Sequence, residues 1–385
     1  MKNEKSIKLI FYFLVFTYVI QLLFLYACSV ENNYVNHFVE NGIGIARHVE
    51  PADPSSVLRP AIPAGYDAET VLELGKCPGP GFEGLSESGL DGQGLGIAII
   101  GGVLYTEHEE YQDNLVHYEE IGVPENAPPV DSASWAASVA VGKNCGVAPG
   151  ASLYYIAVDE EDETQQGYIQ ALQHLIAINR TLPREQKIRA VVINKQFSEE
   201  PSEELQQAIK DAYAAQMHVI YPYTHTNRGC CFNLYMTFGV IYPPQKVTRN
   251  DITSDPKDPH HYIPYHLWDS VDNGTAEDTS SRYDQLHLAL GARTFASADG
   301  SYAFFQNGVN GLEPAYIAGL YILAMQINSR MTPQKFYEEA LQGSAFVFSG
   351  TYVNKEGSTM GFENLHMANP AGMIAWLQEQ QEGDS

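Results

Sequence analysis

The sequence predicts an α/β domain with a mainly parallel central sheet and helices on both of its faces. Short apolar runs bounded by glycine or polar residues are typical of strands that are buried on both sides. Four such runs lie at 95–100, 153–158, 190–193 and 218–221. Helical stretches separate them at 132–141, 164–178 and 202–217. Because strands and helices alternate along the chain, we expect parallel strands, with a functional site beyond their carboxyl ends.

The C-terminal half adds elements of a different kind. The stretch 311–328 is apolar on all sides, which predicts a helix buried in the core. Thr332 and Pro333 have the residue types of an N-cap and a first helical position. Further elements are expected as strands at 288–290 and 302–305 and as a last helix at 370–380.

Length and charge limit the functions that the chain can serve. Its 385 residues allow one large domain or two ordinary ones, and a hydrophobic content of 44% indicates a folded protein. Lys and Arg number 22 against 47 Asp and Glu, which gives a net charge of −25. Such an excess of negative charge repels phosphate groups, so no nucleic-acid partner is expected.

The amino terminus has the features of an export signal. Lysines within the first eight residues precede an apolar run over 9–25, a pattern that orients the remainder of a chain outside the cytosol. The segment 25–28, which ends at Cys28, is similar to the lipobox of bacterial lipoproteins, in which the cysteine carries the lipid. The alternative is an uncleaved membrane helix, because the run nearly spans a bilayer. In either case we expect an exported protein, anchored to the outer face of the cell membrane.

Three segments are expected along the chain. Residues 1–27 are predicted to be a lipoprotein-type signal peptide, 28–82 a tether and entry segment, and 83–380 the globular domain. The middle segment contains six prolines and lacks sustained periodicity, which favours extended or irregular chain.

Four stretches of the globular domain resemble the subtilisin-like serine peptidases. They are the strand sequence 92–100, the segment 142–151 with its Gly-Val-Ala-Pro-Gly-Ala, the helix start Pro314–Gly319 and the pair Asn369–Pro370. They occur in the order found in that family and cover about residues 70 to 380. The resemblance implies a subtilisin-like α/β fold for this part of the chain.

The same resemblance implies that the catalytic triad is degenerate. A peptidase of this kind needs an aspartate after the first core strand, a histidine at the start of the next helix and a serine before the buried helix. Here these positions hold Gly101, Ser132 and Gly311. No shift of register restores them, because 122–147 contain no histidine and 302–328 contain no serine, threonine or cysteine. In subtilisin itself, loss of the triad lowers turnover by about 2 × 10⁶.

We therefore expect no catalytic residue, a loss of serine endopeptidase activity, and a peptide or protein ligand in the former substrate groove. Family members without the triad serve as sensors or protein partners. Two alternatives stay open. One is a secreted peptidase of the same family with relocated groups, such as His108 or His225 near Asn227, the candidate for the oxyanion asparagine. The other is an envelope lipoprotein with a purely structural role.

Other polar residues favour structural roles. His108 with Glu107, Glu109 and Glu110 has the residue types of an acid/base group, but the pattern favours a solvated loop. Ser132 and Ser134 are expected to cap the helix that starts there.

No cofactor is expected, although the resemblance leaves a structural calcium ion open. The acidic run 159–163 lacks a defined ligand register for calcium and favours a solvated loop. A group of histidines and aspartates lies among prolines, which favours an ordered surface loop over a metal site. It comprises Asp258, His260, His261, His266 and Asp269.

Four cysteines remain if Cys28 carries a lipid, and their pairing stays open. They are Cys77, Cys145, Cys230 and Cys231. Neighbours in sequence form a strained disulfide, so Cys230 and Cys231 are expected to pair elsewhere or to stay reduced.

Overall fold

The structure is a computed structural model that describes the main body of the chain and parts of its entry segment. The described residues are 45–47, 72–73, 75–79, 81–82, 85, 89–195, 197, 201–222, 228–231, 234–242, 263–264, 286–290, 293–305, 311–353 and 359–383. The predicted signal peptide, Cys28, His225, Asn227 and the predicted His and Asp loop group lie outside them. Within the described part, no helix is both long enough and apolar enough to cross a membrane.

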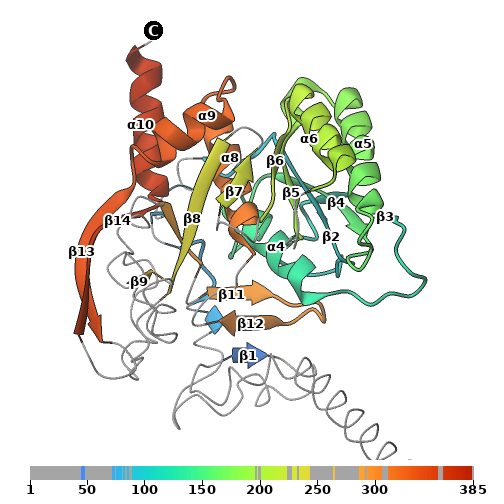
Figure 1. The fold of residues 1–385 in the computed structure, drawn as a ribbon, viewed down its shortest axis with the longest axis horizontal. Coiled ribbons are helices and arrows are strands. Elements are labelled where there is room, and N and C mark those ends of the chain that lie inside the picture. Colours follow the sequence, from blue (N-terminus) through green and yellow to red (C-terminus); the bar gives the residue numbers. More distant parts are fainter. Residues whose placement is uncertain are drawn as a thin grey trace, which may run out of the picture.

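Five parallel strands form the central sheet (Figure 1). Their order is β3–β4–β2–β5–β6, and each neighbouring pair runs parallel. The strands are β2 (Gly96–Gly101), β3 (Leu115–Ile121), β4 (Ser152–Val158), β5 (Ile188–Ile193) and β6 (His218–Ile220). Four of them confirm the predicted apolar runs. The edge strand β3 is not among the predicted strands, because its alternation of polar and apolar residues lacks a continuous apolar run.

Helices cover both faces of this sheet. On one face lie α4 (Asp131–Val141) and α8 (Glu313–Ile327), and on the other α5 (Gln166–Thr181) and α6 (Glu203–Ala214). Alternate residues of β2 enter the two cores: Ile97 and Ile99 join the side of α4 and α8, whereas Ala98 and Ile100 join that of α5 and α6. The predicted fold class, a mainly parallel α/β sheet with helices on both faces, is confirmed.

The helix starts differ in how they are capped. Ser202 caps α6, since its Oγ accepts a hydrogen bond from the Leu205 N–H at 3.2 Å. The N-cap of α4 is Val130, without a side-chain cap, and the Ser134 Oγ instead accepts from the Tyr111 hydroxyl at 3.0 Å. The capping roles predicted for Ser132 and Ser134 are therefore wrong, because the helix starts before both of them.

A small antiparallel sheet leads toward the start of α8. In it β11 (Arg293–Ala296) pairs with β12 (Tyr302–Phe305), which confirms the strand predicted at 302–305. The strand β1 (Ile45–Arg47) pairs with β12 from the other side, so a piece of the predicted tether is held in this sheet. The Thr294 hydroxyl also donates to the Leu72 carbonyl at 2.7 Å. The end of the entry segment is thereby bound to the same hairpin.

A mixed sheet contains the remaining strands, in the order β13–β14–β10–β8–β7, with β9 paired to β8. They are β7 (Arg228–Cys231), β8 (Leu234–Tyr242), β9 (Ile263–Pro264), β10 (Leu286–Ala289), β13 (Phe346–Val353) and β14 (Thr359–Met367). Of these, β10 overlaps the strand predicted at 288–290. The others are not predicted by the sequence.

Short helical elements complete the chain. The Thr332 Oγ accepts from the Lys335 N–H at 3.2 Å, which confirms its N-cap role at α9 (Pro333–Lys335). A π-helix, η6 (Phe336–Leu341), follows directly, and α10 (Pro370–Gly383) packs against α8. The 3-10 helix η3 (Arg184–Gln186) connects α5 to β5.

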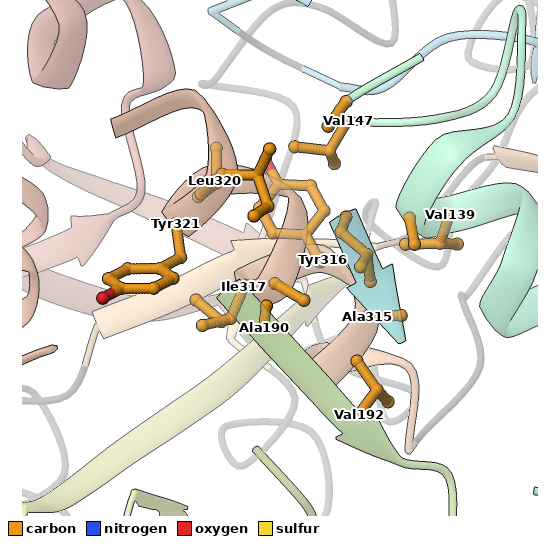
Figure 2. Packing of buried hydrophobic residues seen from close by; sticks show 14 of the residues in the cluster. Val139, Val147, Ala190, Val192, Ala315, Tyr316, Ile317, Leu320 and Tyr321 are labelled. Atoms are coloured by element: carbon orange, nitrogen blue, oxygen red, sulfur yellow. The ribbon is translucent and has the colours of Figure 1, made fainter. Parts of the chain in front are cut away.

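The segment after α4 lies so close to α8 that no methyl group fits between them. A Cβ on Gly319 would lie 2.5 Å from the Val147 Cβ. Figure 2 shows Val147 directed toward α8, beside Leu320 and Tyr316. Val147 is held in place by a hydrogen bond from its N–H to the Val139 carbonyl at 2.9 Å. Contact between two of the stretches that carry the family resemblance thus requires glycine at 319.

We expect Gly319→Ala to destabilise the fold by about 1–3 kcal/mol, because overpacking outweighs the better helix propensity of alanine. Urea unfolding followed by circular dichroism measures the change. The matched control is Gly319→Ala combined with Val147→Ala, which removes the obstructing methyl groups and should cost less than the two single changes added together. Strict additivity would contradict the close contact.

Candidate functional site

The space beside Gly101 is occupied by two polar side chains. This residue ends β2, and the resemblance assigns it to the position of the aspartate. A Cβ on it would lie 3.0 Å from the Tyr155 Oη and 3.2 Å from the Asn194 Cβ. Tyr155 is fully buried, and its hydroxyl donates to the Gly102 carbonyl at 2.8 Å. Tyrosine and asparagine therefore fill the volume that an aspartate side chain would need.

Asn194 joins this position to the start of α4. Its main-chain N–H donates to the Ile100 carbonyl at 2.8 Å, and its Nδ2 donates to the Ser132 carbonyl at 3.0 Å. The structure thus brings Gly101 and Ser132 together, as the resemblance implies for the aspartate and histidine positions. Neither residue supplies a base, because glycine has no side chain and a serine hydroxyl does not accept a proton at neutral pH.

Gly311, which the resemblance assigns to the position of the nucleophile, lies just before α8 and has a φ of +90°. A Cβ there would meet no atom within 4 Å. Any side chain would therefore be strained by the left-handed backbone and not by crowding. The Gly311 N–H donates to the Glu313 Oε2 at 2.8 Å, and burial raises the pKa of Glu313 above its ordinary value. A carboxyl group accordingly lies next to Gly311.

A second carboxyl group, from the acidic run 159–163, lies at the carboxyl end of the sheet. Glu160 follows β4, and its Oε2 lies 2.6 Å from where a Cβ on Gly102 would be. Burial raises the pKa of Glu160, although Lys195 and the Gly102 N–H partly offset this effect. Lys195 also donates to the Glu160 main-chain carbonyl at 2.6 Å. The sequence signal for this placement of Glu160 was the glycine pair at 101–102, because Gly102 leaves the space that the carboxyl group occupies.

The acidic run around Glu160 only partly matches its prediction. Glu161 and Glu163 are exposed, as expected of a solvated loop, whereas Glu160 is half-buried. The prediction is therefore wrong for Glu160, which folds inward over Gly102. Within the described ranges, no group of three His, Cys, Asp or Glu residues is placed to hold a metal ion.

His108 does not lie in a solvated loop, since it is only 1% exposed. Its Nε2 lies 2.8 Å from the Ser301 carbonyl, which makes this nitrogen the donor, and its Nδ1 accepts from the Glu110 N–H at 3.2 Å. Burial lowers the pKa of His108 and so favours the neutral ring. Both ring nitrogens are therefore occupied, which leaves neither for proton transfer to a substrate.

Glu110 is also only 1% exposed, so the predicted solvated loop is wrong for this residue too. Its carboxylate accepts from Asn144 (N–H at 2.8 Å and Nδ2 at 2.9 Å), from the Cys145 N–H at 3.2 Å and from the Tyr302 hydroxyl at 2.9 Å. Burial alone would raise the pKa of Glu110, but these donors hold it below its ordinary value. The loop is buried because Glu110 satisfies the main chain of the turn after α4.

Three further histidines lie next to a carboxylate or a tyrosine hydroxyl. His117 and His174 lie 3.4 Å and 3.0 Å from the two oxygens of Glu119. His218 lies in the core, with its Nε2 3.2 Å from the Tyr337 hydroxyl. Burial lowers the pKa of His218 to about 3. These contacts form no pair of the serine–histidine type.

Comparisons with known proteins find similarity in solved structures alone. No protein-family model and no curated protein matches the chain. One similar structure is "Prenylagaramide maturation protease PagA", at 15% identity and a TM-score of 0.46, covering 77% of this chain and 98% of that one. A second is "PatG macrocyclase in complex with peptide", at 13% identity and a TM-score of 0.47, covering 77% of this chain and 96% of that one. A third is a cold-adapted subtilisin-like serine proteinase, at 14% identity and a TM-score of 0.39, covering 72% of this chain and 89% of that one.

With TM-scores below 0.5, these similarities carry no argument about activity, substrate or partner. The fold class rests on the strand order, register and helix placement of the chain itself.

Gly101→Asp should destabilise the protein by about 1–3 kcal/mol, because the new side chain would collide with Tyr155 and Asn194. Thermal unfolding of the variant and of the native chain measures the loss. The destabilisation caused by Gly101→Asp should be smaller when Tyr155→Phe has removed the obstructing oxygen. Comparison of the double variant with Tyr155→Phe alone measures this coupling between the two positions. An unchanged melting temperature in Gly101→Asp would show that the space is not filled.

Glu110→Gln should destabilise the fold by about 1–3 kcal/mol at neutral pH, where the charged acceptor is replaced by an amide. Because folding lowers the pKa of Glu110 from about 4.5, its stabilising effect is complete above that pH and is lost as the pH falls through the lower, folded-state pKa. Urea unfolding between pH 7 and pH 3 measures the difference in the free energy of unfolding between the native chain and Glu110→Gln, which should become smaller as the pH falls. The control is Glu107→Gln at an exposed position, and a gap that stays constant with pH would contradict the role of the carboxylate.

Proposed function

We propose that the chain is an exported, membrane-anchored member of the subtilisin-like peptidase family that has lost serine endopeptidase activity and binds a peptide or protein. The observation that carries the proposal is the environment of Gly101, where Tyr155 and Asn194 take the space of an aspartate. The histidine and serine positions hold Ser132 and Gly311. These positions supply no carboxylate to orient an imidazole, no imidazole to accept a proton and no hydroxyl to attack a carbonyl carbon.

Binding without catalysis is supported by the survival of the packed scaffold. Ligands of parallel α/β sheets bind beyond the carboxyl ends of the strands. At that end lie Asn194, Lys195 and Glu160, all half-buried. An amide, an amine and a carboxyl group are suited to hydrogen bonds with a peptide main chain. The remaining groups thus favour recognition of a peptide over its hydrolysis.

The location of the protein is proposed from its amino terminus. The lysines, the apolar run over 9–25 and Cys28 support export, cleavage after residue 27 and lipid attachment at Cys28. The protein would then act at the outer face of the membrane.

A peptidase with relocated groups is less well supported. Both ring nitrogens of His108 are occupied by main-chain partners within the buried loop. His225 and Asn227 lie outside the described residues, so this alternative rests on them. Release of casein peptides that is lost in His225→Ala would favour it.

The test is reaction of the purified protein with a fluorophosphonate, which modifies the activated serine of serine hydrolases. We expect labelling no greater than that of a heat-denatured sample, because no hydroxyl is activated at the former nucleophile position. In the same preparation, fluorescein-labelled casein peptides should raise their anisotropy on binding, without being cleaved.

An active subtilisin-like peptidase serves as the positive control for the label. Stoichiometric labelling of the native protein would overturn the loss of activity, and mass spectrometry would identify the serine involved. Anisotropy that does not change with protein concentration would overturn the binding role and favour a purely structural lipoprotein.

A further inference from the structure

Arg293 is a buried cation whose hydrogen bonds are incomplete. It lies in β11 and is the largest fully buried side chain of the described residues. Its Nη2 donates to the Cys145 carbonyl at 2.6 Å, and its Cζ lies 5.7 Å from the centre of the Tyr316 ring. Its Nε and Nη1 are also buried, and neither has a hydrogen-bond partner. Two donors of a charged group therefore lack an acceptor where β11, the turn after α4 and α8 meet.

Burial of this guanidinium group without a counter-charge is unfavourable. An arginine keeps its proton in folded proteins, so it does not escape burial by becoming neutral, as a lysine can. A buried charge is stable only when opposite charge and hydrogen bonds replace the water that it loses. A carbonyl and the face of an aromatic ring supply only partial negative charge. Arg293 therefore requires a further acceptor, and a negatively charged one satisfies it best.

The carboxylates of the described residues leave Arg293 without an ion pair. The acid on the other side of the Cys145 main chain is Glu110. Its Oε1 accepts from the Asn144 Nδ2 and the Tyr302 hydroxyl, and its Oε2 accepts from the N–H groups of Asn144 and Cys145. Both oxygens are thus occupied. Glu110 attracts Arg293 across the Cys145 main chain, but it offers no acceptor to Nε or Nη1.

The two neighbours of the guanidinium group do not supply a negative charge either. Cys145 carries a free thiol, and burial raises the pKa of this thiol well above its ordinary value, an effect that Arg293 only partly offsets. Burial likewise raises the pKa of Tyr316, again with a partial offset by Arg293. At neutral pH both side chains are therefore protonated, and the counter-charge has to come from outside the described side chains.

We propose that the Arg293 guanidinium group binds a small inorganic anion, of the charge and size of chloride, between β11, the turn after α4 and α8. The anion accepts hydrogen bonds that the Cys145 carbonyl and the Tyr316 ring leave unmade. Because Arg293 has no exposed surface, the anion is taken up as these elements close on one another, and a larger ligand is excluded. This inference goes beyond the proposed function and holds whether or not the protein binds a peptide.

The bound anion should stabilise the part of the domain that holds the entry segment. Thr294, the residue after Arg293, donates its hydroxyl to the Leu72 carbonyl at 2.7 Å. An anion that binds only the folded chain raises its stability in proportion to the logarithm of the anion concentration, once that concentration exceeds the dissociation constant. The stability of the whole chain should therefore depend on which anion is present.

The test is thermal unfolding of the full-length chain in mixtures of sodium chloride and sodium gluconate at constant total salt. Constant ionic strength is needed because the net charge of −25 makes the chain sensitive to screening by any salt. Gluconate is too large for the site. The melting temperature should rise by about 2 °C for each tenfold increase in chloride above the dissociation constant.

Two variants show whether Arg293 is responsible. Arg293→Met keeps an extended side chain without the charge and should lose the dependence on chloride. Arg184→Met, the matched control, removes an exposed arginine and should retain this dependence. Equal melting temperatures of the native chain in chloride and gluconate would overturn the proposal. A chloride effect that persists in Arg293→Met would overturn it too, because it would indicate adventitious surface ions only.

Bromide provides a second measurement that does not require the variant to fold. Crystals of the native chain grown in sodium bromide should show an anomalous scattering peak within hydrogen-bond distance of the Arg293 Nε or Nη1. The absence of a peak there, or peaks at exposed side chains alone, would overturn the proposal. Fluorophosphonate labelling and peptide anisotropy do not depend on these outcomes, so failure of this inference is distinguishable from failure of the proposed function.

Discussion

The hydrogen bonds of Asn194 hold the ends of β5 and β2 and the start of α4 together. This residue follows β5, donates its N–H to the end of β2 and donates its side-chain amide to the start of α4. It thereby fixes Gly101 and Ser132 close together. The resemblance assigns these two positions to the aspartate and the histidine of a catalytic triad. In the structure, the space beside Gly101 is filled by Asn194 and Tyr155.

A second network, made of buried hydrogen bonds, takes the place of contacts with water in the loop after β2. Glu110 satisfies the main-chain N–H groups of Asn144 and Cys145, and His108 binds the Ser301 carbonyl. A buried carboxylate is stable only when such donors surround it. The polar groups that suggest acid/base chemistry in the sequence therefore serve to connect the loop to the turn after α4 and to the β11–β12 hairpin. Their hydrogen bonds hold these parts of the fold together.

The β11–β12 hairpin also holds the entry segment against the domain. Lys76 lies on the Tyr302 ring, and the Leu72 carbonyl binds Thr294. The strand β1 also pairs with β12. The described parts of the segment expected as an irregular tether are thus attached at several points to the β11–β12 hairpin.

The sequence by itself determined the parallel sheet and its two layers of helices, because buried strands and a buried helix require continuous apolar runs such as 95–100 and 311–328. The resemblance found in it also assigns Gly101, Ser132 and Gly311 to the three triad positions. Only the tertiary structure decided that Tyr155 and Asn194 fill the space beside Gly101, that Glu160 folds over Gly102, and that His108 and Glu110 are buried. Local patterns report periodicity along one segment, whereas the burial of a polar side chain depends on donors that distant segments bring to it.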